Sequence, residues 1–137
     1  MVDNDYESNI EVTSFLELPI EIGTIGDYKR NKRVKRRPDK LKSNTPIVWV
    51  DDKNSKIGFA DQNYSLIFDK SEIKLFSIQN ILPAKGSGGA YLEVNFNDNS
   101  RSYAVLGGEC KIFDNYKGEL NKLTGLEVRM APEYHDC

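Results

Sequence analysis

The sequence predicts a mainly β (α+β) protein: an antiparallel sandwich or barrel of seven strands, followed by one C-terminal helix. Short stretches that alternate apolar and polar residues recur along the chain, and turn-forming sequences separate them at regular intervals. Only one stretch, near the C-terminus, has the 3.6-residue periodicity of an amphipathic helix. A length of 137 residues suits a single domain with its own core.

The first predicted strand, residues 16–22, alternates leucine and isoleucine with Glu17, Pro19 and Glu21. Because Pro19 cannot donate a hydrogen bond to a neighbouring strand, we expect this strand at the edge of a sheet. In the fifth strand the apolar positions change phase, which predicts a bulge near Leu75. The strands expected after the first are residues 47–50, 57–60, 65–68, 73–78, 91–96 and 101–106.

The predicted helix covers residues 111–123, where apolar residues fall on one side and polar residues on the other. Gly125 follows at the position that favours a left-handed C-terminal cap. Gly118 costs a helix about 1 kcal/mol relative to alanine, so packing must hold this element in place. We expect its apolar stripe to cover one open end of the sheet.

Charge is distributed unevenly over a chain whose net charge is only −2. Residues 1–28 carry seven acidic and no basic groups, whereas residues 29–42 carry nine basic groups and one acidic group. We predict an acidic mobile tail at 1–9, one β-rich domain at 10–125 with a basic inter-strand segment at 27–44, and a C-terminal tail at 126–137.

The sequence predicts an intracellular protein, cytoplasmic, or nuclear if the source is eukaryotic. Two cysteines, Cys110 and Cys137, cannot form a disulfide framework. The N-terminus is acidic and has no apolar run typical of a signal peptide, and no stretch approaches the ~20 apolar residues of a transmembrane helix.

The basic segment is the feature that most strongly indicates a function. Like charges packed this densely repel one another, so we do not expect a packed structure there, and an anionic partner would relieve the repulsion. Lysines supply point charges and arginines supply bidentate forks for phosphate, and the absence of aromatic residues from the run predicts phosphate contact rather than base stacking. The candidate anion-binding residues are Lys29, Arg30, Lys32, Arg33, Lys35, Arg36, Arg37, Lys40 and Lys42.

The order of elements over residues 16–125 resembles the pleckstrin-homology-like (PH-like) superfold. The resemblance implies two nearly orthogonal sheets closed at one corner by the last helix. Phosphoinositide-binding members carry a basic loop after the first strand, and Lys32 followed by Lys35, Arg36 and Arg37 is similar to their lysine and basic-x-Arg pattern. The connection here is longer, and Trp49 lies in the second strand rather than on the last helix. An OB-like or other small β-barrel is the alternative fold.

The predicted function is a non-catalytic binding module that engages a polyanion, with nucleic acid preferred. The alternatives are a protein adaptor whose basic segment meets an acidic partner, binding to an anionic membrane surface, and a solvated loop neutralised by the acidic N-terminus. A small enzyme that uses carboxylates alone is the remaining alternative. No cofactor, metal ion or catalytic residue is predicted, because no nucleophile, base and orienting group can be assembled around the single histidine, His135.

Overall fold

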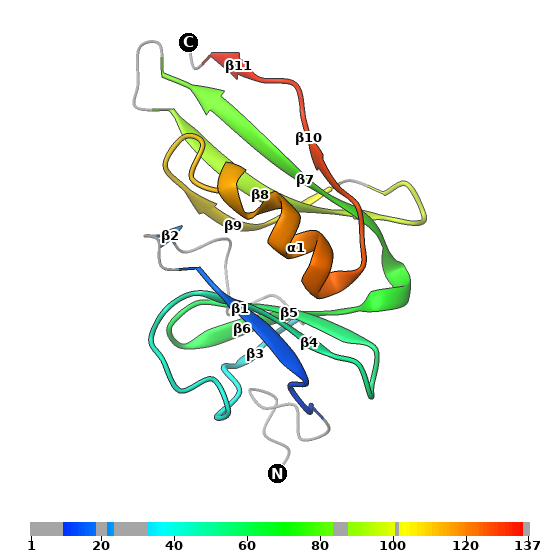
Figure 1. The fold of residues 1–137 in the computed structure, drawn as a ribbon. Helices are drawn as coiled ribbons and strands as arrows, with labels where there is room; N and C mark the ends of the chain where they lie inside the picture. The colour runs from blue at the N-terminus through cyan, green and yellow to red at the C-terminus, as the bar shows by residue number, and fades with distance from the viewer. Residues whose placement is uncertain (1–9, 19–21, 24–32, 84–87, 101, 136–137) are drawn as a thin grey trace.

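The computed structural model describes residues 10–18, 22–23, 33–83, 88–100 and 102–135 (Figure 1). The first half of the chain forms β1 (Ser14–Glu17), β2 (Ile22–Gly23), β3 (Val34–Arg36), β4 (Ile47–Asp51), β5 (Lys56–Ala60) and β6 (Tyr64–Asp69). The second half forms the 3₁₀ turn η1 (Lys70–Glu72), β7 (Ile73–Leu82), β8 (Gly89–Phe96), β9 (Tyr103–Gly108), η2 (Asp114–Tyr116), α1 (Lys117–Thr124), β10 (Val128–Met130) and β11 (Tyr134–His135).

These strands form two sheets, and no barrel closes among the described strands. The first sheet has the order β1-β4-β5-β6-β3, and the second has the order β10-β7-β8-β9-β2, with β11 also beside β7. Neighbouring strands are antiparallel except for β10 and β11, which run parallel to β7. The protein is therefore a mainly β domain with one short helix, as the alternating sequence pattern predicted.

The main core lies between the two sheets and α1. Alternate residues of the central strands point into it, among them Val48, Phe59, Phe68 and Phe76, all nearly inaccessible to solvent. Phe59 packs edge-on against both Phe68 and Phe76, with ring centroids 5.8 Å apart in each pair. The helix contacts β1 and β4 of the first sheet and β10 of the second, so it closes the side between them (Figure 1).

A second apolar cluster occupies the opposite face of the first sheet. Its members on the strands, including Ile47 and Trp49, alternate in sequence with residues of the main core. Val12 and Leu41 cover it from the segments before β1 and after β3. The first sheet is thus buried on both faces over part of its area, which explains why 47–50 is apolar at every position.

Two predicted elements differ from the structure at the ends of the domain. The single strand expected at 16–22 is instead β1 in the first sheet and β2 in the second, so this stretch contributes to both sheets. Residues 126–137, predicted as a tail, supply β10 and β11 to the second sheet. Three-residue and two-residue strands with distant partners leave no local periodicity to recognise.

Other predictions about these elements are confirmed. β1 lies at an edge of the first sheet, while Pro19 lies outside the described residues. The register between β7 and β8 shifts between Ile73 and Leu75, where the phase of the apolar positions changes. The predicted helix start is wrong: α1 runs from Lys117 to Thr124, six residues later than the start predicted at residue 111, although Gly125 follows it with φ of +72° as the predicted left-handed cap. None of the helices in the described part of the chain has the length and apolar character needed to cross a membrane.

Candidate polyanion-binding surface

The basic segment is partly built into the first sheet. Its residues 34–36 form β3, which pairs antiparallel with β6 at the sheet edge opposite β1. This corrects the expectation that charge repulsion would keep the segment out of packed structure. The predicted residues Lys29, Arg30 and Lys32 lie outside the described residues.

Arg37 serves as the centre of the loop that follows β3. Its side chain is buried, with 8% of the residue exposed. In the described part of the chain, the acceptors of its hydrogen bonds are backbone carbonyl oxygens. Nη1 reaches the carbonyl oxygens of Thr45 at 2.9 Å and Asp61 at 2.7 Å. Nη2 reaches that of Ser43 at 2.5 Å, and Nε that of Leu41 at 3.3 Å. The guanidinium group therefore holds residues 41–45 in a loop around it and links this loop, through Asp61, to the turn after β5.

The role of Arg37 follows from this geometry. Burial lowers the pKa of its guanidinium, while the nearby carboxylates of Asp61 and Glu17 act in the opposite direction. A guanidinium loses its proton only at extreme pH, so the group stays charged and needs the carbonyl dipoles around it. Because these donors are already committed to the backbone, Arg37 supports the loop and is not placed to bind phosphate.

Lys40 connects the same loop to the N-terminal segment. Its Nζ donates a hydrogen bond to the carbonyl oxygen of Val12 at 2.7 Å. Next to it, Leu41 packs in the second apolar cluster together with Val12 and Trp49. The positive charge of Lys40 thus also takes part in holding the loop over the first sheet.

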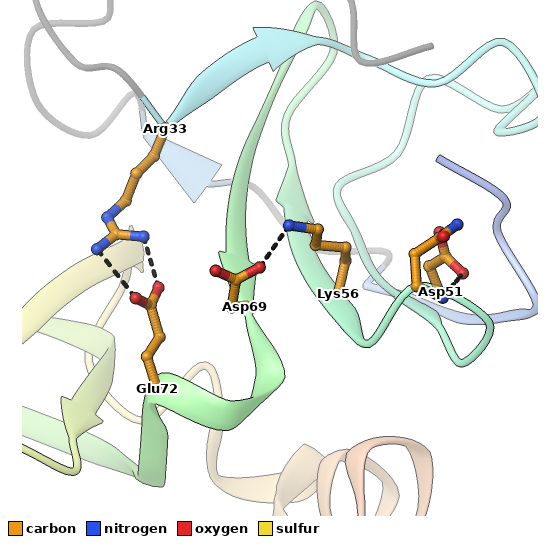
Figure 2. A network of polar contacts seen from close by, with 6 residues as sticks. Arg33, Asp51, Lys56, Asp69 and Glu72 are labelled. Atoms are coloured by element: carbon orange, nitrogen blue, oxygen red, sulfur yellow. Dashed lines mark hydrogen bonds and ion pairs between the residues drawn. The ribbon is translucent and has the colours of Figure 1, made fainter. Parts of the chain in front are cut away.

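Arg33 is paired with a carboxylate. Its guanidinium meets Glu72 of η1 through two nitrogens, with Nη1–Oε1 at 2.5 Å and Nη2–Oε2 at 3.4 Å (Figure 2). The guanidinium carbon also lies 4.6 Å from the ring centroid of Phe68 and 5.6 Å from that of Phe96. This arrangement joins the start of β3 to the junction between the two sheets.

A pocket of about 220 Å³ lies beside this ion pair. Its walls are Arg33, Glu72, Phe96, Asn97, Asp98 and Ser100. Hydrogen bonds from the Ser100 hydroxyl and N–H lower the pKa of Asp98, so its carboxylate is ionised at neutral pH. With Glu72 neutralising Arg33 and a second carboxylate at the rim, the pocket disfavours a phosphate.

The remaining predicted residues are Lys35, Arg36 and Lys42, on β3 and on the loop that follows it; we call these three residues together the basic surface, although they do not share one face of the sheet. Lys35 and Arg36 are on β3, where successive side chains point to opposite faces of the strand. Lys42 is exposed on the loop between Leu41 and Ser43, whose carbonyls both bind Arg37. The buried arginine therefore fixes the backbone that carries these cationic side chains.

Sequence reasoning missed Tyr64, which the fold places beside Arg36. The two residues are directly opposite each other in the β3–β6 register. The N–H of Arg37 donates to the carbonyl oxygen of Asn63, and the N–H of Ile67 donates to that of Arg33. Hydrogen-bonded and non-hydrogen-bonded pairs alternate along antiparallel strands, so Arg36 and Tyr64 form a non-hydrogen-bonded pair. Side chains approach most closely in such pairs. Only strand pairing could reveal this neighbour, because 28 positions separate the two residues.

Other candidate chemistry in the chain is structural. Asp51 is buried and accepts hydrogen bonds from the N–H of Glu11 at 2.8 Å and from the N–H and side-chain amide of Asn54 at 2.9 Å each. These bonds close the turn that follows β4. Lys56 and Asp69 form an ion pair across β5 and β6 (Figure 2). In the described ranges, no group of three histidine, cysteine, aspartate or glutamate side chains could hold a metal ion.

The fold and this surface define a small two-sheet β domain with a basic edge strand. The chain belongs to the PM0294 C-terminal domain family, whose model matches residues 1–135. No solved structure matches the chain.

Proposed function

We propose that this domain is a non-catalytic binding module that engages a polyanion, with nucleic acid preferred, through the basic surface. The observation that carries the proposal is the position of Lys35 and Arg36 on an edge strand, next to a loop that presents Lys42. Cations on a pre-formed backbone lose less conformational entropy when they bind than cations on an unstructured chain. Phosphate contacts of this kind release condensed counterions from a nucleic acid and give affinity that falls with salt.

The order of elements supports a PH-like domain as the finer description of the fold. A first stretch that contributes to both sheets is followed by β4 to β9, and α1 then packs against the side between the sheets. Under this proposal β3 and the loop after it are an elaboration of the connection between the first two main strands. A PH-like fold would leave the ligand open, because one fold serves many functions.

The test is a salt titration of binding to duplex DNA, single-stranded RNA and vesicles that contain an acidic phospholipid. The variant K35Q/R36Q/K42Q removes the three charges of the basic surface. For duplex DNA we expect the slope of log K against log salt to become shallower by about 3, since each phosphate contact contributes about 0.9. Stronger binding to vesicles than to either nucleic acid would indicate that the ligand is an acidic phospholipid and not a nucleic acid.

A matched control variant distinguishes the effect of the basic surface on binding from the effect of net charge. The variant K74Q/K117Q/K122Q removes three charges from exposed lysines of β7 and α1. It should leave affinity and salt slope close to those of the unmodified protein. Equal losses in the two triple variants, or no binding to any of the three ligands at low salt, would refute the proposal.

A protein adaptor is the second candidate, and the edge strand β1 favours it. Phe15 on this strand has 46% of its surface exposed, and β1 is the end strand of the first sheet. Exposed edge strands can pair with an extended peptide by β-augmentation. The discriminating experiment is capture of a partner that survives nuclease treatment and is lost when Phe15→Lys is introduced.

A further inference from the structure

We propose that the ligand of the basic surface is a single-stranded nucleic acid, and that one of its bases stacks on Tyr64. The inference rests on the proposed function and names the substrate class. Tyr64 has 40% of its surface exposed, although it is an aromatic residue at the start of a sheet strand. It lies directly across from Arg36, so an aromatic face and a phosphate-binding fork are adjacent on one pair of strands.

The turn before β6 holds Tyr64 in this position. The Oδ1 atom of Asp61 accepts hydrogen bonds from the N–H groups of Asn63 and Tyr64, both at 2.8 Å. The N–H of Asp61 in turn donates to the carbonyl oxygen of Tyr64 at 3.0 Å. Arg37 fixes this turn from the other side through the carbonyl oxygen of Asp61. A side chain on which a base stacks gains from this support, because a backbone that is already fixed loses little conformational entropy on binding.

Single strands fit this arrangement better than duplexes. Bases in a duplex are stacked on one another, so an aromatic side chain reaches their faces only after a base pair has been opened. In a single strand each base presents a face, and cationic groups a short distance away can follow the phosphates. Arg36, which lies directly across from Tyr64 on the β3–β6 pair, would supply such a contact to the phosphate next to the stacked base.

Binding through charge alone does not need the tyrosine ring, so the contributions of charge and of base stacking to the affinity can be measured separately. A polyanion without bases, such as heparin, would use Lys35, Arg36 and Lys42 but not the tyrosine ring. A single-stranded oligonucleotide would use both. The test therefore compares a 20-nucleotide oligothymidine, an abasic oligonucleotide of the same length and heparin, all at one salt concentration.

For Tyr64→Ala we expect the dissociation constant for oligothymidine to rise about 5- to 150-fold, which corresponds to the loss of one stacked base. The constants for heparin and for the abasic oligonucleotide should change less than twofold. Tyr64→Phe keeps the ring and should bind oligothymidine like the unmodified protein. Tyr91→Ala removes a similarly exposed tyrosine, 39% accessible, from β8 of the second sheet and should have no effect.

The outcomes distinguish this inference from the proposed function. If the unmodified protein binds neither heparin nor oligothymidine, both proposals fail. If it binds both, but Tyr64→Ala weakens all three ligands equally or none of them, the stacking inference is wrong and the polyanion proposal stands. The emission of Trp49, which is buried on β4 of the same sheet, reports whether each variant remains folded.

Discussion

The indole ring of Trp49 on β4 lies directly against Gly58, its register partner on β5. A Cβ atom at Gly58 would overlap the Cε2 and Cζ2 atoms of the indole. Beyond the glycine, the indole Nε1 donates a hydrogen bond to the hydroxyl of Ser65 on β6 at 2.8 Å. The missing side chain thus lets one tryptophan cross a neighbouring strand and satisfy its only polar atom in a fully buried position.

Gly58→Ala should therefore lower the free energy of unfolding by about 2 kcal/mol or more. Trp49 has no exposed surface, so the ring cannot move aside without disturbing the cluster around it. Unfolding in urea, followed by the fluorescence of Trp49, measures the change. A shift of the native emission maximum would show in addition that the indole has been displaced.

Gly118→Ala is the matched control. This glycine is on α1 and is exposed, and apart from its chain neighbours and the backbone of its own helix no described heavy atom lies within 4 Å of where a Cβ would lie. We expect the alanine to raise the free energy of unfolding by about 0.5–1 kcal/mol, because alanine has the higher helix propensity. A similar loss of stability in both variants would contradict the role assigned to Gly58.

Local pattern predicted much of the fold. Short apolar or alternating runs separated by turn sequences located the strands that became β4 to β9. β4 to β6 are buried at nearly every position, whereas β8 buries alternate side chains from Ala90 to Val94. The phase change at Leu75 located the bulge. The helix was predicted six residues too long at its start because Phe113 and Tyr116 point to the core from a turn and a 3₁₀ segment with similar spacing. β3 and β10 were missed because their partners, β6 and β7, are distant in sequence.

The candidate site was less accessible to sequence reasoning than the fold. A run of nine basic residues indicates an anionic partner, but it does not show that Arg33 meets Glu72 or that Arg37 is surrounded by carbonyls. Both facts depend on long-range chain geometry. The same applies to Tyr64, whose relation to Arg36 exists only through strand register.

Arg37→Met should lower the free energy of unfolding by about 3 kcal/mol. The substitution leaves the backbone carbonyls that Arg37 binds without their charged donor, and buried acceptors without partners are costly. Because the loop after β3 covers the cluster around Trp49, we also expect a red shift of the tryptophan emission. Arg37→Lys should recover little of the loss, since an ammonium cannot match the span of the guanidinium fork.

Arg129→Met is the control for that variant. Arg129 pairs with Glu127 at 2.9 Å on the surface, and both side chains are more than half exposed. Exposed pairs contribute little, so we expect a change below about 0.5 kcal/mol. If Arg37→Met unfolds at the same urea concentration as Arg129→Met, Arg37 does not hold the loop.

The stability of the protein should fall at acid pH partly through Asp51. Burial on its own would raise the pKa of this carboxyl, but the hydrogen bonds from Glu11, Asn54 and Lys53 outweigh it and bring the pKa below its ordinary value of 3.8. A carboxyl with a lowered pKa in the folded state stabilises the protein above the unfolded-state pKa. This contribution is lost as the pH falls through the folded-state pKa.

Asp51→Asn tests this assignment. We expect a loss of about 2 kcal/mol at pH 7, because hydrogen bonds to a charged acceptor are replaced by weaker ones. The difference from the unmodified protein should begin to shrink as the pH falls below about 4, where the carboxyl takes up a proton in the unfolded state, and should vanish once the pH is below the lowered folded-state pKa. Asp52→Asn removes the same charge from the exposed neighbour and should cost less at pH 7. A difference for Asp51→Asn that does not vary with pH would contradict the prediction.

Asn80→Ala should destabilise the connection between β9 and α1. Asn80 has no exposed surface, its amide nitrogen donates to Asp114 Oδ1 at 3.0 Å, and its Oδ1 accepts the N–H of Lys111 at 2.8 Å. Lys111 has φ of +67°, a left-handed conformation that costs energy for a lysine and needs support from its surroundings. We expect a loss of about 2–3 kcal/mol.

Hydrogen exchange locates the effect of Asn80→Ala, because amides of residues 109–116 should lose more protection than those of β4 to β6. Gln79→Ala is the control on the same strand. Its amide donates to the carbonyl oxygen of Pro132 at 2.7 Å in an exposed position, where water can replace it. A loss below about 1 kcal/mol is expected there, so comparable losses at positions 79 and 80 would show that burial of the Asn80 amide is not what stabilises the connection.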